Sequence, residues 1–191
     1  LGGITLHVCH VEVRRRRSVQ RGLQDADGRC DEDLVLARLQ HVQRFGIGYA
    51  PDGFNGLKDA LGTDERRLGL LDKTGMLSKN DTGRVYDKFR DRVMFPIHDR
   101  RGRVIAFGGR VLDKEDGPKY LNSPETALFH KGRELYGLWQ VKQAHSKIPR
   151  LIVVEGYMDV VALFQYGVNT AVATLGTATT PDHAELLFRN A

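Results

Sequence analysis

The sequence contains little cysteine: Cys9 and Cys30 are the only two among its 191 residues. Two cysteines cannot build the disulfide framework of a small secreted domain, so a reducing compartment is expected. Long apolar runs are missing too, since none approaches the roughly 20 residues that span a bilayer. No secretory signal pattern opens the chain. We therefore expect a cytoplasmic protein that has no membrane partner.

A recognisable zinc site is also missing from residues 1–30. Four side chains of this stretch are of the zinc-binding type: His7, Cys9, His10 and Cys30. Their spacing is not that of paired zinc ligands. The basic run Arg14–Arg17 fits either a phosphate-binding arm or a solvated terminal segment. Residues 1–30 therefore stay unassigned, with disorder and a non-native origin both open.

Basic charge is present in one part of the chain and scarce in another. Residues 84–150 carry 15 basic and 8 acidic side chains, whereas residues 151–191 carry 1 and 4. A basic segment that leads into an acidic one favours a groove for a polyanion ending at a metal-binding carboxylate. The alternative is that many of these Lys and Arg side chains form an ordinary solvated surface.

One stretch, LIVVEGYMDVVA at residues 151–162, combines a strand, a carboxylate and a helix. Leu151–Val154 is a short apolar run typical of a strand buried on both faces. Glu155 follows at the strand's carboxyl end, where open α/β sheets bind ligands, and Gly156 permits a sharp turn. Apolar positions over Tyr157–Tyr166 have helical spacing. Glu155 is either a site carboxylate or a solvated residue at a strand–helix corner.

The same alternation continues to the end of the chain. Asn169–Thr174 reads as a second strand, and Thr180-Pro181-Asp182 as the start of a helix that runs through Phe188. This β-α-β-α order predicts the beginning of a parallel sheet. Because two strands do not make a stable doubly wound sheet, we expect the sheet to be incomplete and the chain to be a fragment.

The region before residue 151 has mixed patterns. Helices are predicted at the following ranges: 33–45, 55–61, 64–71 and 138–145. Arg92–Ile97 and Arg103–Phe107 are β-rich runs around a turn, which predicts a hairpin. Ser123-Pro124-Glu125 has the pattern of a helix N-cap followed by proline.

Several stretches taken together resemble the catalytic core of the bacterial replicative DNA primase family. They are VVEGYMDVVAL with GTATTPDH, RVMFPIHDRRGRVIAFGGRVL, PKYLNSPET and FHKGRELYGL. The resemblance runs from about Asp31 to the C-terminus. It implies an α/β protein with an α+β N-terminal subdomain over 31–148 and an incomplete Rossmann-like TOPRIM sheet over 149–191.

The resemblance implies metal-dependent nucleotidyl transfer with Mg²⁺ or Mn²⁺. In the family, a glutamate after the first TOPRIM strand and a later Asp-x-Asp pair form the site. Glu155 matches the glutamate, as metal ligand or catalytic acid/base, and Asp159 is a weaker second ligand. Asp159 reads equally well as an acid that favours a helix N-terminus. No Asp-x-Asp follows Glu155, so we expect the fragment to be inactive alone. The family's zinc belongs to a zinc-ribbon domain that this chain lacks.

The resemblance also implies nucleic-acid and nucleotide contacts. The matching positions are Arg44, Arg90, Arg110, Lys119, Asn122 and Lys131. For Arg44 and Arg90 a surface ion pair is nearly as good an interpretation. Lys88 stands where relatives often have arginine. The implied partners are a single-stranded DNA template, ribonucleoside triphosphates, the RNA primer and a replicative helicase bound through regions outside this stretch.

Two other classes of function remain open. Another TOPRIM enzyme, a topoisomerase or nuclease, would share the Glu155 motif, although PKYLNSPET and RVMFPIHD disfavour it. A non-catalytic module that binds single-stranded DNA would explain the missing half of the metal site. Aromatic stacking platforms are sparse in the basic segment, which disfavours binding by stacking alone.

Overall fold

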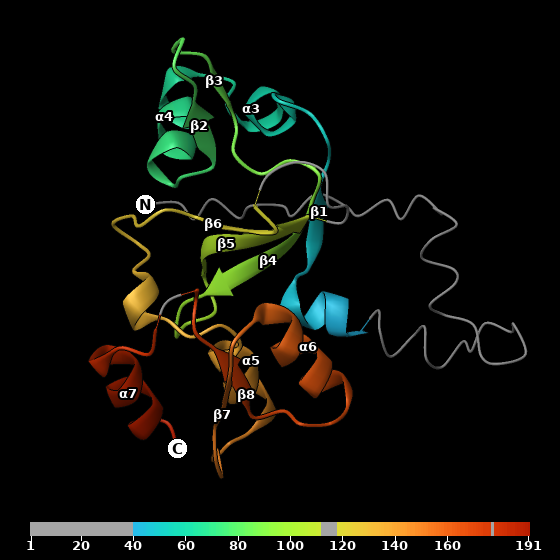
Figure 1. Ribbon diagram of the computed structural model, residues 1–191, viewed down its shortest axis with the longest axis vertical. Helices are drawn as coiled ribbons and strands as arrows, with labels where there is room; N and C mark the ends of the chain where they lie inside the picture. Colours follow the sequence, from blue (N-terminus) through green and yellow to red (C-terminus); the bar gives the residue numbers. More distant parts are fainter. Residues whose placement is uncertain (1–39, 112–117, 177) are drawn as a thin grey trace, which may run out of the picture.

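The computed structural model describes residues 40–111, 118–176 and 178–191. Its elements form three groups along the longest axis: a small helical group at the top, an antiparallel sheet in the middle and an α/β group at the bottom (Figure 1). The predictions for residues 1–30, for the start of the helix from residue 33 and for the acidic loop Asp113–Gly117 lie outside the described residues. No helix in the described ranges is both long and apolar enough to cross a membrane.

The middle group is a four-stranded antiparallel sheet in the order β1-β4-β5-β6. Its strands are β1 (Gly48–Ala50), β4 (Arg92–His98), β5 (Val104–Val111) and β6 (Tyr120–Asn122). The predicted hairpin is confirmed as β4 and β5, which pair from Arg92 with Val111 to His98 with Val104. Asp99 closes its turn, because its carboxylate accepts hydrogen bonds from the backbone N–H groups of Arg101 and Arg103 at 2.8 and 2.9 Å.

The top group contains α3 (Gly56–Leu61), α4 (Glu65–Lys73), β2 (Leu77–Lys79) and β3 (Val85–Asp87). Both short helices agree with the sequence prediction, and an acidic side chain accepts hydrogen bonds from the N-terminal backbone N–H groups of each. Asp64 caps α4 by accepting from the backbone of Arg67. The buried Asp87 carboxylate accepts from the backbone N–H groups of Leu57 and Lys58 at 2.7 and 3.0 Å. Asp87 therefore fixes α3 against the end of β3.

The bottom group has the predicted β-α-β-α order. It contains α5 (Leu138–Ala144), β7 (Ile152–Val154), α6 (Tyr157–Gln165), β8 (Ala171–Ala173) and α7 (Pro181–Phe188). The prediction of parallel strands is confirmed, with Ile152 opposite Ala171 and Val154 opposite Ala173. Thr180 caps α7 and Pro181 occupies its first turn, as the sequence pattern indicated.

Burial of the central strand differs from the prediction. Ala171–Ala173 of β8 is fully buried, but the residues of β7 are only half-buried and the Val153 side chain is 43% exposed. β7 has β8 on one side and no second strand among the described residues. A strand at the edge of a two-stranded sheet keeps one side accessible, which explains the difference.

The helix predicted from Ser123-Pro124-Glu125 is wrong. Ser123 instead extends the β5–β6 pairing, because its N–H donates to the carbonyl of Phe107 at 2.8 Å. Its hydroxyl accepts from the backbone N–H of Phe107 at 3.0 Å. The hydroxyl that would have capped a helix is thus committed to β5, and the chain runs on to the 3₁₀ turn η1 (Lys131–Arg133).

One aromatic core joins the sheet to the bottom group. Phe95 of β4 stacks on Tyr157 of α6 at 5.5 Å between ring centroids, and Tyr136 meets Tyr157 edge-on at 4.9 Å. Phe45, from helical residues 40–45, meets Phe164 of α6 edge-on at 5.1 Å. All five rings are buried. Apolar burial and ring contacts therefore fix the strand–helix corner at Glu155 relative to the sheet.

Candidate active site

A cleft of about 330 Å³ lies where the sheet meets the bottom group. It is lined by Tyr120, Asn122, Glu155, Gly156, Tyr157, Asp159, Thr174 and Gly176. The first two come from β6, Glu155 and Gly156 from the turn after β7, Tyr157 and Asp159 from the first turn of α6, and the last two from the segment after β8. The carboxyl ends of both parallel strands open into this cleft, which is where α/β sheets bind ligands.

Glu155 directly follows β7, as the sequence indicated, and its side chain is exposed. Among the described residues no hydrogen-bond or ion-pair partner holds its carboxylate. A carboxylate with free oxygens at the rim of a cleft is available to a cation or to a proton on a bound molecule.

Asp159 also lines the cleft, but one of its oxygens is engaged. Its Oδ2 accepts a hydrogen bond from the backbone N–H of Gly156 at 3.1 Å and so caps the N-terminus of α6. This contact supports the helix-capping interpretation of Asp159. Its other carboxylate oxygen makes no hydrogen bond within the described part of the chain, and Asp159 lines the same cleft as Glu155.

These carboxylates fit part of a metal site. No group of three or more His, Cys, Asp or Glu side chains comes together in the described part of the chain. Glu155 and Asp159 offer oxygen ligands of the type that hard divalent cations prefer. A complete coordination sphere would need further groups from substrate, water or residues beyond those described.

Cationic side chains flank the cleft along β5 and β6. Lys119 is exposed and its Nζ lies 5.9 Å from the ring centroid of Tyr120. The guanidinium of Arg110 lies 5.7 Å from the same ring. Tyr120, which is 43% exposed, thus carries a positive group from each of two neighbouring strands.

Comparison with known proteins gives two matches that cover most of the chain. Residues 37–142 match the model of the DNA primase catalytic core, N-terminal domain, and residues 150–191 match that of the Toprim domain. The chain belongs to the DNA primase family. The primase match over 37–142 speaks against the alternative of a topoisomerase or another Toprim nuclease. A Toprim domain is also consistent with the use of a divalent metal.

The relatives include the DNA primase of Escherichia coli K12, which is 64% identical over 149 residues, or 78% of this chain and 25% of that protein. A solved DnaG primase catalytic domain bound to single-stranded DNA is 53% identical, with a TM-score of 0.76 over 90% of this chain and 56% of that one. A primase domain from Pseudomonas aeruginosa is 47% identical, with a TM-score of 0.77 over 92% and 57%. The chain therefore spans about a quarter of the curated primase it matches.

Two further cations, Lys88 and Lys131, approach each other outside the cleft lining. Burial and the nearby charge of Lys131 lower the pKa of Lys88. Lys131 lies in η1, where its backbone N–H donates to Glu125 at 2.9 Å and its carbonyl lies 2.9 Å from Nε2 of the buried His183. The sequence identified both lysines, but it gave no sign that they lie close together.

Arg90 and Arg44 make aromatic contacts, and within the described ranges neither forms the surface ion pair considered for it. The Arg90 guanidinium lies 4.5 Å from the ring centroid of Phe54 and 5.0 Å from that of Tyr86. It also donates to the carbonyl of Asp87 at 2.8 Å. Arg44 lies 5.2 Å from the ring centroid of Phe164. Neither arginine lines the cleft.

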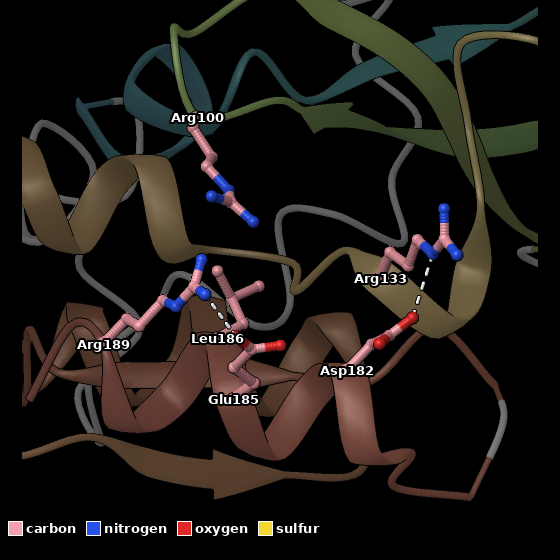
Figure 2. Close-up of a pocket in the computed structure, with 6 residues that line it drawn as sticks. All are labelled: Arg100, Arg133, Asp182, Glu185, Leu186 and Arg189. Carbon is pink, nitrogen blue, oxygen red and sulfur yellow. Dashed lines mark hydrogen bonds and ion pairs between the residues drawn. The ribbon is translucent and has the colours of Figure 1, made fainter.

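A second, smaller pocket of about 150 Å³ lies between the turn of the β4–β5 hairpin, η1 and α7 (Figure 2). Arg133 pairs with Asp182 at 2.9 Å across it, and Arg189 pairs with Glu185 within α7. Arg100 points toward the pocket from the hairpin turn (Figure 2). Because acidic side chains neutralise most of its positive charge, this pocket reads as a contact between elements rather than an anion site.

Sequence reasoning did not single out Tyr120, Tyr157 or Thr174 as cleft residues. Tyr120 follows Lys119 within PKYLNSPET, so the motif contained the signal. The sequence pattern places Tyr157 only at the start of a helix. Its cleft position depends on packing against β4 and β5, which lie 46 to 65 residues earlier in the chain and which no local pattern reveals.

Proposed function

We propose that this chain is part of a primase that copies single-stranded DNA into short RNA primers by metal-dependent nucleotidyl transfer. The observation that carries the proposal is the cleft itself. It brings a carboxylate at the end of a parallel strand, Glu155, next to β6, the strand that Lys119 directly precedes. The single-stranded DNA in the structure of a relative that is 53% identical supports the same class of template.

The chemistry requires an attack by the 3′-hydroxyl of the primer on the α-phosphorus of a ribonucleoside triphosphate, with pyrophosphate leaving. Bound Mg²⁺ or Mn²⁺ would neutralise charge on the reacting phosphate and on the leaving pyrophosphate. Glu155 is the residue of this chain that would hold the ion, with Asp159 as a weaker contributor. The remaining ligands would come from outside the described residues.

Lys119 and Arg110, which flank the cleft residue Tyr120, would bind phosphates of nucleotide and template, and Lys131 would add a phosphate contact near Lys88. Arg44 and Arg90 would contact the template farther along its path. The RNA primer would occupy the same surface as it grows. Contacts with a replicative helicase and a cytoplasmic location follow from this role and belong to the proposal.

Glu155→Gln in a longer primase polypeptide that carries this sequence tests the proposal. The substitution keeps size and removes charge, so primer synthesis should fall by on the order of a hundredfold or more. Binding of single-stranded DNA should change little, because the phosphate contacts lie on other residues. Glu65→Gln, at an exposed position in the first turn of α4, is the matched control and should leave synthesis unchanged.

Primer yield on a single-stranded template, with all four nucleotides and magnesium, is the measurement. A folded Glu155→Gln protein that synthesises primers at a near-normal rate would remove Glu155 from the active site. The 191-residue chain alone should make no primer, since its described residues do not form a cluster of three metal-binding side chains.

A further inference from the structure

We propose that Tyr157 and Asn122 form a positioning pair that sets the location of the Glu155 carboxylate. In this view Asn122 contributes to catalysis by holding Tyr157 in place. The family resemblance implied a different role for Asn122, a direct contact with the nucleotide. This inference rests on the proposed function for its link to catalysis. The contacts of Tyr157 and Asn122 that support it all lie within the described residues.

The ring of Tyr157 is anchored in the antiparallel sheet although the residue belongs to α6. It is 4% exposed and stacks on Phe95 of β4. On β5, a Cβ atom added at Gly108 would lie 2.5 Å from Cε2 of the Tyr157 ring. No real Cβ tolerates that distance, so only glycine leaves room for the ring there. Tyr157 is thus inserted against the backbone of the sheet.

The hydroxyl of Tyr157 makes the second anchor. It donates a hydrogen bond to Oδ1 of Asn122 on β6. Nδ2 of Asn122 donates in turn to the carbonyl of Leu175 at 3.2 Å. The side-chain amide of Asn122 therefore connects the start of α6 to the segment after β8.

These two tied segments border Glu155. Tyr157 follows Glu155 by two residues, and Leu175 lies in the segment that follows β8, the strand paired with β7. The Glu155 side chain is exposed and has no partner among the described residues. Its place in the cleft is therefore set by its backbone, and Tyr157 is the nearest buried side chain that holds this backbone.

The molecule contains a matched control in the same core. Tyr136 is 1% exposed and its ring centroid lies 4.9 Å from that of Tyr157. Its hydroxyl is buried without a hydrogen-bond partner in the described part of the chain. Removing the hydroxyl of Tyr136 thus changes a buried phenol of the same cluster without breaking a hydrogen bond.

The test uses Tyr157→Phe, Asn122→Leu and their combination in the longer primase polypeptide. Each single change should lower kcat for primer synthesis about tenfold, while the nucleotide KM and the Kd for single-stranded DNA stay within about twofold. Because the two residues act as one unit, kcat of the double variant should be no lower than kcat of either single variant. Tyr136→Phe should leave kcat unchanged. Asn122→Asp, which keeps the acceptor for Tyr157, should retain more activity than Asn122→Leu.

A direct nucleotide contact by Asn122 gives a different result and would overturn the inference. Asn122→Leu would then raise the nucleotide KM, and its effect would add to that of Tyr157→Phe. A kcat for Tyr157→Phe equal to that of the parent would overturn it as well.

Amide hydrogen exchange in the 191-residue chain provides a readout that needs no activity. Peptides that cover residues 154–158 and 174–176 should exchange at least tenfold faster in Tyr157→Phe than in Tyr136→Phe, with β4 and β5 unchanged. Equal exchange in the two variants would refute the positioning pair. If the longer parent polypeptide makes no primers, the proposed function fails, and the exchange result still decides the role of this pair.

Discussion

Gly108 illustrates, at the scale of a residue, how an absent side chain shapes the site. Glycine is required there by a close approach, since the space a Cβ would need is filled by the Tyr157 ring. Gly108 lies within β5, where the ring meets the strand backbone. What approaches could not be foreseen, because Tyr157 comes from a helix 49 positions along the chain.

Gly108→Ala should destabilise the chain by about 1–3 kcal/mol, the usual cost of overpacking a core. The added methyl group must displace either the Tyr157 ring or the backbone of β5. Gly69→Ala is the control, because a Cβ at that position in α4 meets nothing within 4 Å. Alanine in an open helical position should stabilise by about 0.5–1 kcal/mol. Urea unfolding of both variants measures the difference, and equal stabilities would contradict the close approach.

At the scale of elements, two similar sequence patterns have different outcomes. Ser123-Pro124-Glu125 and Thr180-Pro181-Asp182 both read as a cap, a proline and an acid. Only the second starts a helix, α7, because the Ser123 hydroxyl is taken by the backbone of Phe107 in β5. The patterns are alike locally. The competing partner lies 16 residues away, so local pattern reasoning could not separate them.

Thr180 does more than cap α7. Its hydroxyl accepts from the backbone N–H of His183 at 3.1 Å and donates to the carbonyl of Gly132 in η1 at 2.6 Å. The buried His183 ring adds contacts to the carbonyls of Lys131 and Glu134 at 2.9 and 3.1 Å. The start of α7 therefore holds the turn that presents Lys131.

Thr180→Ala should cost about 1–2 kcal/mol of unfolding free energy, because it removes a helix cap and leaves the Gly132 carbonyl without its hydroxyl partner. Thr180→Ser keeps the hydroxyl and should lose less than half as much. Thermal unfolding of the two variants is the measurement. Identical losses for alanine and serine would mean that the Thr180 methyl group, not the hydroxyl, matters.

At the scale of the whole molecule, the sequence predicted local order better than long-range pairing. The strand–helix corner at Glu155, the β4–β5 hairpin and the parallel pair follow from patterns within about 25 residues. The pairing of β1 with β4 and of β6 with β5 joins segments that have no distinctive pattern of their own. The pairing of β6 with β5 brings β6 next to the carboxyl ends of β7 and β8, and the cleft lies between them. The cleft position of Glu155 was therefore predictable, and PKYLNSPET contained a signal for Tyr120, whereas nothing in the local pattern placed Tyr157 in the cleft.

The overall charge distribution leads to a prediction about DNA binding by the 191-residue chain. Residues 84–150 carry 15 basic side chains, and they include Lys119 beside the cleft and Lys131 near Lys88. Each phosphate contact releases counterions, so the logarithm of the affinity for single-stranded DNA should fall linearly with the logarithm of salt concentration, by about 0.7 for each contact. Titrations over a range of salt concentrations measure this slope.

Lys119→Ala combined with Lys131→Ala should flatten that slope by about 1.4, because two contacts are lost. Lys147→Ala is the control, since this exposed lysine belongs to the same basic segment but lies in the linker before β7. It should leave the slope unchanged if the DNA follows the surface next to the cleft. If instead all three lysines contribute equally, the positive charge is a diffuse surface property. The path of the template would then have to be placed away from Glu155, which would weaken the case for a shared active site.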